Sequence, residues 1–496
     1  MTGRELIEHG LRRLPHYGTA ELSALDDLCL EEARALGLDP PTTVFHLAPS
    51  EEIYDIACRG LPGRYSHWRF GQDYERQKGG YDRGESRIYE LVLNTRPAHA
   101  YLLEGNGLVA QLLVIAHVLG HTHVFARNRY FEPADKGFLP RVRSAAERIR
   151  GYMAEHGRQV VEDLIDDAEA LALSRSLDQL GDRFEEREPA FEQRPYDELF
   201  PDEVADRRAR VERERDAWRS RFPRQPERDL LGFVMRHARL LEDWQRDVIG
   251  IVREETGYFV PQLRTKVLNE GFATWTHNRV VQALGLDTDD FLEFNRLNAT
   301  VARPHPDHPN PYHLGWTVFR EIERIAAEPT DEERERWAWA GAGPEAGLQR
   351  ILEVVEGYDD VALLAEFVTP RVCELAQLFA WERAGGGPDR IVVTSREADE
   401  VRRRLLALHA NAGLPVVEIV DADGLGQGQL FLEHRHEDVG LDDEYARGTL
   451  RHLATLWGKP VVVRTIERRD PGPVWLVAHP GRRDVERTRV EPTRAA

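Results

Sequence analysis

Apolar residues recur at helical spacing over most of this chain, and the pattern predicts a mainly helical protein. The predicted helices cover residues 1–40, 50–60, 108–124, 140–173, 230–256, 261–284, 314–327 and 361–382. Shorter apolar stretches at 44–48, 87–94 and 98–103 predict the strands of a small antiparallel sheet, in which the last two form a hairpin. The stretch 108–124 is apolar on nearly every side, so we expect this helix to be buried.

Two changes in the pattern divide the chain. Residues 182–229 are crowded with Arg, Glu and Asp and interrupted by prolines, which is typical of a charged linker or excursion. A glycine-rich run that ends at Pro388 marks a second boundary. After it, the expected order is strand, helix, strand, strand, helix, strand, at 391–394, 397–410, 415–420, 429–434, 442–457 and 460–465. This order predicts a ferredoxin-like βαββαβ domain.

The predicted fold class is therefore α+β, with three parts. Residues 1–181 and 230–384 are expected to form a mainly helical, zincin-like core. Residues 182–229 are the charged linker, and residues 386–496 form the small C-terminal α+β domain.

Composition narrows the class of protein. The 496 residues are enough for a sizeable core, and no run of about 18 apolar residues predicts a membrane span. The three cysteines are scattered, which indicates a reducing compartment and no thiolate zinc site. A formal charge of −20 argues against non-specific binding to nucleic acids or anionic membranes. We expect a cytoplasmic protein that binds neither nucleic acids nor membranes.

The strongest chemical signal is a pair of histidines in the apolar helix. His117 and His121 are four residues apart, so their side chains lie on one helical face and can share a cation. Glu270, in an apolar stretch of another predicted helix, can supply a third ligand. Zinc peptidases with the motif H-E-x-x-H use this ligand set, but Val118 stands where they carry the catalytic glutamate. The sequence predicts a divalent metal site, with zinc as the expected ion and iron as the alternative. A buried hydrogen-bond network of the same residues is the other interpretation.

Further residues are candidates around this site. Without an acid at position 118, Glu90 is the candidate catalytic base, because it lies on a strand that precedes the metal helix. Four other residues are candidates for supporting the ligands or contacting a substrate. They are Asn269, next to Glu270; His277, two helical turns later; His123, just past His121; and Tyr312, in a turn before a helix.

Several segments together resemble the SpoVR (stage V sporulation protein R) family. They include His67-Trp68-Arg69-Phe70-Gly71, Ser86-Arg87-Ile88-Tyr89-Glu90, Ile115-Ala116-His117-Val118-Leu119-Gly120-His121, Leu268-Asn269-Glu270-Gly271 and Asn310-Pro311-Tyr312-His313. The likeness covers most of the chain in the right order. It implies a cytoplasmic bacterial protein with a sporulation or stress role, associated with an AAA-type serine protein kinase and a von Willebrand-like partner. Within the most family-like segment, His67, Tyr81 and Arg87 are further candidates for orienting a substrate.

Three functions remain open at this point. The first is a divergent metal-dependent hydrolase with an unconventional base. The second is a non-haem iron enzyme, because two histidines and one carboxylate also form the facial triad of such enzymes. The third is a non-enzymatic adaptor of the kinase, in which the His-Glu cluster only stabilises the fold.

Overall fold

The fold is taken from a computed structural model of the chain. It describes residues 1–82, 90–134, 137–175, 189–193, 195, 197–199, 201–220, 222–304, 308–383, 391–424, 427–436, 440–467 and 470–489. The chain forms two compact units, one from Met1–Arg150 and Tyr258–Ala410, the other from Gly151–Gly257 and Asn411–Ala496. The bounds of these units differ from those of the predicted domains: residues 151–181 and 230–257 group with the C-terminal segment, and residues 386–410 group with the first unit.

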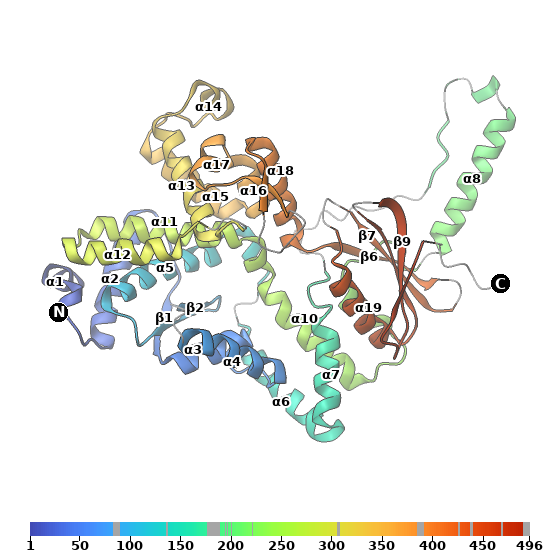
Figure 1. The fold of residues 1–496 in the computed structure, drawn as a ribbon, viewed down its shortest axis with the longest axis horizontal. Coiled ribbons are helices and arrows are strands. Elements are labelled where there is room, and N and C mark those ends of the chain that lie inside the picture. Colours follow the sequence, from blue (N-terminus) through green and yellow to red (C-terminus); the bar gives the residue numbers. More distant parts are fainter. Residues whose placement is uncertain are drawn as a thin grey trace. The chain divides into compact units, whose positions relative to one another are not determined.

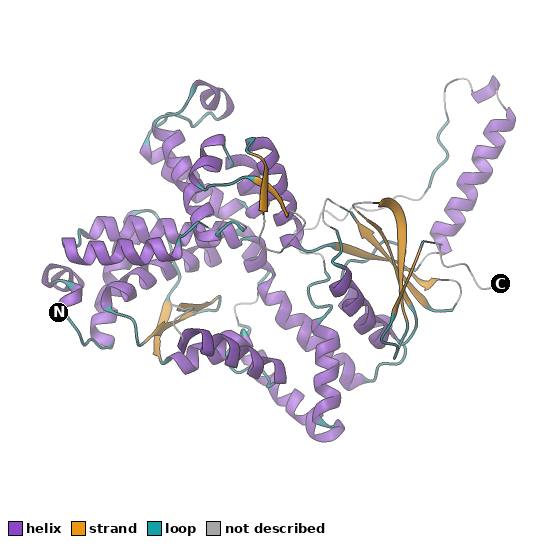
Figure 2. Cartoon of the chain, viewed as in Figure 1, coloured by secondary structure: helices purple, strands orange, loops and turns teal. Residues whose placement is uncertain are grey.

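Helices make up most of the described chain, as predicted, and the strands are confined to small sheets (Figure 2). In the first unit the helices that precede the central one are α1 (Gly3–His9), α2 (Thr19–Ala35), α3 (Ser50–Arg59) and α4 (Trp68–Asp82). The central and later helices are α5 (Leu108–Arg127), α11 (Lys266–Leu284), α12 (Thr288–Val301), α13 (Pro311–Ala327), α14 (Asp331–Arg336), α15 (Pro344–Gly357), α16 (Asp360–Phe367), α17 (Pro370–Leu375) and α18 (Ala398–His409). Its strands are β1 (Thr43–Ala48), β2 (Glu90–Leu93), β3 (Ala98–Leu103), β4 (Ala380–Arg383) and β5 (Ile391–Ser395).

The second unit contains fewer helices and a larger sheet. Its elements are α7 (Arg158–Glu169), α8 (Pro201–Ser220), α9 (Leu230–His237), α19 (Asp443–Trp457), β6 (Val416–Gly424), β7 (Gln429–Arg435), β8 (Val461–Glu467), β9 (Asp470–Ala478) and β10 (Val485–Thr488). Two helices, α6 (Leu139–His156) and α10 (Asp243–Arg264), run across the bounds of the units. Short 3₁₀ helices cover Leu11–Arg13, Arg129–Phe131, Asp197–Leu199 and Ala410–Gly413. Of the predicted charged linker, residues 182–188, 194, 196, 200 and 221 lie outside the described residues, and much of its described part forms helix α8.

The core of the first unit is built around α5. Residues Leu108 to Phe125 of this helix are all buried, as its pattern predicted. By length and composition α5 would qualify as a membrane span, but its whole apolar window is buried inside the unit. The position of α5 in the core therefore explains why this helix is so apolar.

Helix α11 packs closely against α5 on one side and α13 on the other, because glycines stand at both crossings (Figure 1). A Cβ atom added to Gly120 of α5 would lie 2.7 Å from the Cα of Ala273. A Cβ added to Gly271 of α11 would lie 2.3 Å from the Cα of Gly315 on α13. Real Cβ atoms do not approach other atoms this closely, so only glycine allows the three backbones to meet here.

The small sheet of the first unit is mixed, not antiparallel as predicted. Its order is β1-β3-β2, in which β2 and β3 form the predicted hairpin but β1 runs parallel to β3. Helices α3 and α4 lie between β1 and β2 in the sequence. Strand β3, the second strand of the hairpin, lies between β1 and β2 in the sheet. The sheet lies between α5 on one face and α3 on the other (Figure 1). Glu90 pairs with Leu102, whose side chain joins the core around α5, so Glu90 lies on the same face as that core.

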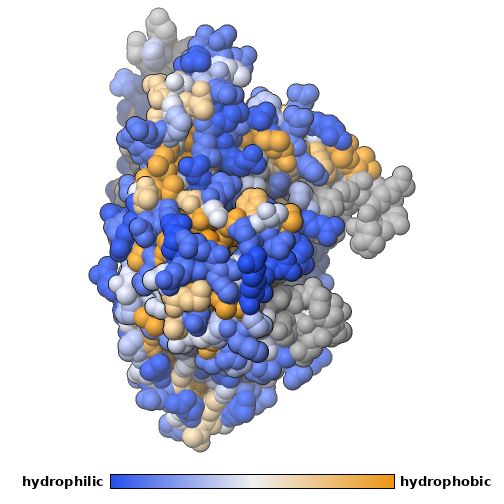
Figure 3. Space-filling view, turned by 90° about the vertical axis from the view of Figure 1, so that its left-hand side faces the viewer, coloured by the Kyte–Doolittle hydropathy of each residue, from blue (hydrophilic) through white to orange (hydrophobic). Residues whose placement is uncertain are grey.

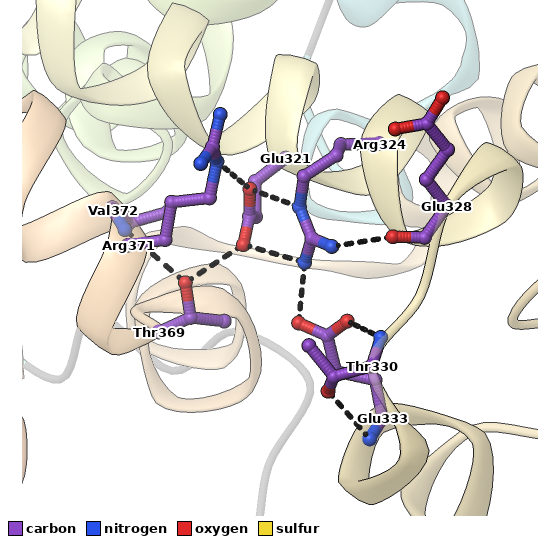
Figure 4. A network of polar contacts seen from close by, with 8 residues as sticks. All are labelled: Glu321, Arg324, Glu328, Thr330, Glu333, Thr369, Arg371 and Val372. Carbon is purple, nitrogen blue, oxygen red and sulfur yellow. Dashed lines mark hydrogen bonds and ion pairs between the residues drawn. The ribbon is translucent and has the colours of Figure 1, made fainter.

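A buried charge network holds the far end of α13 (Figure 4). Glu321 is 2% exposed and accepts hydrogen bonds from Thr369 Oγ1 at 2.9 Å and from the Arg324 guanidinium at 2.9 Å. Arg324 also pairs with Glu333 of α14. A buried carboxylate is costly unless it is paired in this way. The network therefore fixes α13 relative to α14 and α17.

The C-terminal sheet differs from the predicted ferredoxin-like arrangement. Its order is β10-β9-β8-β7-β6, with β7 and β8 parallel, on either side of α19 in the sequence, and the other pairs antiparallel. The predicted first strand is β5, which pairs with β4 in a separate sheet, and the predicted first helix is α18, which packs against α16 in the first unit. The periodicity located most of these elements, but periodicity does not specify which elements pair.

Figure 3 shows one face of the molecule. On its described part, hydrophobic residues lie in small groups between hydrophilic ones. Scattered apolar residues of this kind are ordinary on protein surfaces.

Replacement of Gly271 by alanine should destabilise the protein by about 3 kcal/mol, because the added methyl group would force α11 and α13 apart. The free energy of unfolding, measured with urea, tests this. Gly151→Ala is the matched control, since Gly151 is an exposed helical glycine whose added Cβ would meet no atom within 4 Å. That change should stabilise the protein by about 0.5–1 kcal/mol. Equal effects at both positions would contradict the close approach of the helices.

Candidate metal centre

The two histidines of α5 lie together in the core. His117 and His121 are 2% and 4% exposed, and their ring centroids are 4.5 Å apart. Their positions follow from the helix, since residues four apart lie one turn from each other on one face. Both rings face α11, which Gly120 brings close to α5.

Two carboxylates approach these rings from other elements. Oε2 of Glu270, on α11, lies 3.4 Å from Nε2 of His121 and 3.6 Å from Nε2 of His117. Oε1 of Glu90, on β2, lies 3.9 Å from Nε2 of His117. One ligand atom from each of Glu90, His117 and His121 falls within 4.8 Å of the other two. The structure thus brings together the residues for which the sequence predicts a metal and catalytic role.

The donor atoms fit a divalent cation better than they fit one another. Two ligand atoms of a tetrahedral zinc ion are about 3.3–3.6 Å apart, since each lies about 2.0–2.2 Å from the metal. The separations of 3.4 and 3.6 Å match this spacing. Within the described part of the chain, His117 Nε2 and Glu270 Oε2 are buried and have no hydrogen-bond partner. Buried polar atoms without a partner are rare in native proteins, and a cation between them would satisfy both.

The outer nitrogens of the two rings are held by polar partners. Nδ1 of His121 lies 3.0 Å from Oδ1 of Asn269, and Nδ1 of His117 lies 3.0 Å from Nδ1 of His277. An amide oxygen only accepts, so His121 carries its proton on Nδ1 when neutral, and its Nε2 presents a lone pair toward Glu270. Metal-binding histidines generally use their second nitrogen in this way. Asn269 and His277 therefore lie where the sequence predicts supporting residues.

The pKa values of these groups are shifted in opposite directions. Burial opposes the charge of Glu270, but the two imidazoles outweigh burial and hold its pKa well below its usual range. The pKa of His121 is raised, because Glu270 outweighs the effect of burial. Burial raises the pKa of Glu90, and the histidines offset this only in part. Burial lowers the pKa of His277 to about 3, so this ring is neutral.

Tyr312 covers one side of the cluster. Its ring stacks on His117 with a centroid distance of 5.8 Å and an interplanar angle of 19°. The residue sits at the start of α13, where Asn310 Oδ1 caps the helix by accepting from the Tyr312 amide. Burial and the carboxylates of Glu270 and Glu90 raise the pKa of Tyr312 well above its usual value. The phenol therefore keeps its proton and can donate a hydrogen bond.

The other sequence candidates lie elsewhere or are not described. His123 is buried on another side of α5, where its Nδ1 accepts from the Asp39 amide at 3.0 Å and its ring meets Phe272. His67 lines a separate cavity of about 380 Å³ between α3 and α4. Arg87 and the side chain of Tyr81 lie outside the described residues.

Sequence reasoning did not identify Asn298. Its Oδ1 lies 2.9 Å from Nε2 of His277, at the end of that ring opposite His117. Asp290, Phe294 and Asn298 form the buried face of α12, at spacings of four residues. A polar residue that continues the apolar face of a helix was the available signal, although the sequence does not reveal which residue it contacts.

Comparisons with known proteins match nearly the whole chain to one family. The family model described as "SpoVR like protein" matches residues 16–414, and that described as "SpoVR-like C-terminal domain" matches residues 415–468. The uncharacterised protein YcgB of Escherichia coli (strain K12) is 28% identical over 456 residues, which cover 87% of this chain and 89% of that protein. No solved structure matches the chain. The first match contains every residue of the cluster and ends near Asn411, where the second unit resumes.

In the absence of metal, Glu270 should stabilise the protein most near pH 6. The raised pKa of His121 means that its contribution is complete below the unfolded value of about 6.5 and is lost as the pH rises through the folded value. The lowered pKa of Glu270 means that its contribution is present above about pH 4.3. A tenfold difference in proton affinity between the folded and unfolded states corresponds to about 1.4 kcal/mol of stability.

Urea unfolding with a chelator at pH 6 and pH 9 measures this for the wild type and for Glu270→Gln. The difference in unfolding free energy between the two proteins should shrink at the higher pH. Glu147→Gln, at an exposed position on α6, should show no such trend. A difference that grows with pH would contradict the assigned ion pair.

Proposed function

This chain belongs to the SpoVR family, and we propose that it is a metal-dependent hydrolase of amide bonds, with a zincin-like site formed by His117, His121 and Glu270. The observation that carries the proposal is the convergence of two imidazole nitrogens and a carboxylate oxygen, two of them buried without partners, at the spacing of metal ligands. A structural network would instead bring the same atoms into hydrogen-bonding distance.

Zinc is the ion that this donor set suits best. Two imidazoles and a carboxylate are the protein ligands of many catalytic zinc sites, which keep a further position open. A divalent cation held by these residues would act as a Lewis acid, polarising a substrate carbonyl and making water more acidic. The remaining steps depend on groups of the chain itself.

Glu90 is the proposed general base. In H-E-x-x-H peptidases the base follows the first histidine, but here Val118 is fully buried in the core and carries no acid. Glu90 reaches the same cluster from strand β2, 3.9 Å from His117 Nε2. Burial raises its pKa toward the range where a carboxylate can take a proton from water and return it to a leaving amine.

Tyr312 is the proposed hydrogen-bond donor to the substrate. Its protonated phenol lies beside the carboxylates, and its ring stacks on His117, which fixes its position. A neutral donor in a partly dry site stabilises the negative charge that develops on a carbonyl oxygen during hydrolysis. Tyr312 would therefore act on the oxygen atom, while Glu90 acts on the water.

Two proposals from the family resemblance concern the rest of the protein. The AAA-type serine protein kinase and the von Willebrand-like protein are proposed partners, and a cytoplasmic location is proposed with them. The second unit, which contains the residues matched by the C-terminal family model, is the proposed docking region. An adaptor role for this unit is compatible with a hydrolase in the first.

Elemental analysis of the purified protein should find about one equivalent of zinc per chain, because the donors form one site. His121→Ala should lose the metal. Iron in place of zinc, together with oxygen consumption, would favour the two-histidine, one-carboxylate iron enzyme instead. A protein without any metal that still folds would contradict the proposal and support the adaptor.

Replacement of Glu90 by glutamine should leave the metal in place and lower turnover of a fluorogenic peptide pool by about 100- to 10,000-fold, the usual contribution of a general base. Glu104→Gln is the matched control, since Glu104 is an exposed carboxylate just after β3, and it should retain activity. Unchanged turnover in Glu90→Gln, with metal bound, would exclude Glu90 as the base.

A further inference from the structure

A chain of hydrogen bonds runs from the backbone of α11 to His117. The carbonyl at its first link determines which atom donates and which accepts at every later link. The carbonyl oxygen of Thr274 accepts from Nδ2 of Asn278 at 2.8 Å. A carbonyl can only accept, so the amide of Asn278 must turn its nitrogen toward Thr274 and its oxygen away. That oxygen accepts from Nδ2 of Asn298 on α12 at 3.1 Å. The orientation of the Asn298 amide follows, with its own oxygen facing His277.

The same logic fixes the two rings. Oδ1 of Asn298 can only accept, so Nε2 of His277 carries the proton of their 2.9 Å contact. His277 is completely buried, and a neutral ring with its proton on Nε2 presents a lone pair at Nδ1. That lone pair faces Nδ1 of His117 at 3.0 Å, so His117 must place its proton there. Nε2 of His117 is then free of protons and points toward Glu270 and Glu90.

Without this chain, His117 would favour the opposite arrangement. A proton on its Nε2 would be attracted by the carboxylate of Glu270, whose Oε2 lies 3.6 Å away. That tautomer blocks the nitrogen that a metal ion needs, and the ion would have to displace the proton. The chain opposes this because it offers His117 an acceptor at Nδ1, which a proton on Nε2 would leave unused.

We propose that His277 and Asn298 are positioning residues, which hold His117 in the tautomer that is ready to bind metal. The inference rests on the proposed metal site and deepens it. These residues touch neither ion nor substrate, and they act through His117 alone. They connect α12, which contributes no ligand, to the affinity of the site for metal.

The test compares two replacements of His277. His277→Phe keeps a ring of similar size but removes the acceptor, and it should weaken zinc binding by about 10- to 100-fold, as loss of such supporting contacts does elsewhere. His277→Asn places an oxygen near the former Nδ1 and should bind zinc nearly as well as the wild type. Asn298→Leu should behave like His277→Phe. Zinc affinity is measured by competition with a chromophoric chelator.

His123→Phe is the matched control, because His123 is an equally buried histidine of α5 that contacts Asp39 and Phe272 outside the chain of hydrogen bonds. Its zinc affinity should be unchanged. Circular dichroism checks that each variant is folded. Equal zinc affinity in the wild type and a folded His277→Phe would overturn the inference.

The tautomer itself provides a second, independent reading. In metal-free protein with labelled histidines, ¹⁵N NMR should find the His117 proton on Nδ1 in the wild type and on Nε2 in Asn298→Leu. The same tautomer in both proteins would overturn the inference. A wild type that binds no divalent metal would overturn the proposed function instead. The NMR measurement would still show whether the chain of hydrogen bonds sets the tautomer of His117.

Discussion

The crossing of α11 with its two neighbours is the constraint on which the site depends. Gly271 and Gly315 let the backbones of α11 and α13 touch, and Gly120 does the same for α5 and α11. Side chains of ordinary size at these points would separate helices to the usual 8–10 Å between axes. Glu270 directly precedes Gly271, so the close approach also sets the depth at which its carboxylate meets the histidines. The site is thus a consequence of backbone packing more than of any single polar contact.

Close packing buries charged groups, and interactions among these groups offset part of the cost of burial. Two imidazoles and two carboxylates stand at the edge of an apolar core, where isolated charges are costly. In the metal-free protein the attraction between a protonated His121 and the Glu270 carboxylate offsets part of this cost, which explains the opposite shifts of their pKa values. A divalent cation would offset more of it and would release that proton. The same residues therefore stabilise the fold weakly without metal and bind metal at the expense of a proton.

The parts of this structure that the sequence could predict are those governed by local periodicity. The four-residue spacing of His117 and His121 sufficed to place both on one buried face, and the apolar setting of Glu270 indicated that it needed a partner. The role of Asn298 could not be predicted, since it depends on where α12 crosses α11. The βαββαβ arrangement predicted for the C-terminal region differs from the structure because strand pairing is not local. The segment of β5 was predicted as a strand, but its partner, β4, was predicted to be the end of a helix. Pro370 begins a new helix there, and the chain turns extended after α17.

The two carboxylates also illustrate how one cluster can divide roles between like groups. Glu270 faces both imidazoles and stays ionised, which suits a ligand. Glu90 lies farther from them, with Oε1 at 3.9 Å from Nε2 of His117, and burial together with the neighbouring negative charge of Glu270 raises its pKa. When their environments shift the pKa values of two carboxyl groups in opposite directions, one group can act as an acid or base while the other stays charged. With Val118 in the core, strand β2 brings a carboxylate to the cluster through Glu90, which agrees with the proposed base on β2 and the proposed ligands on α5 and α11.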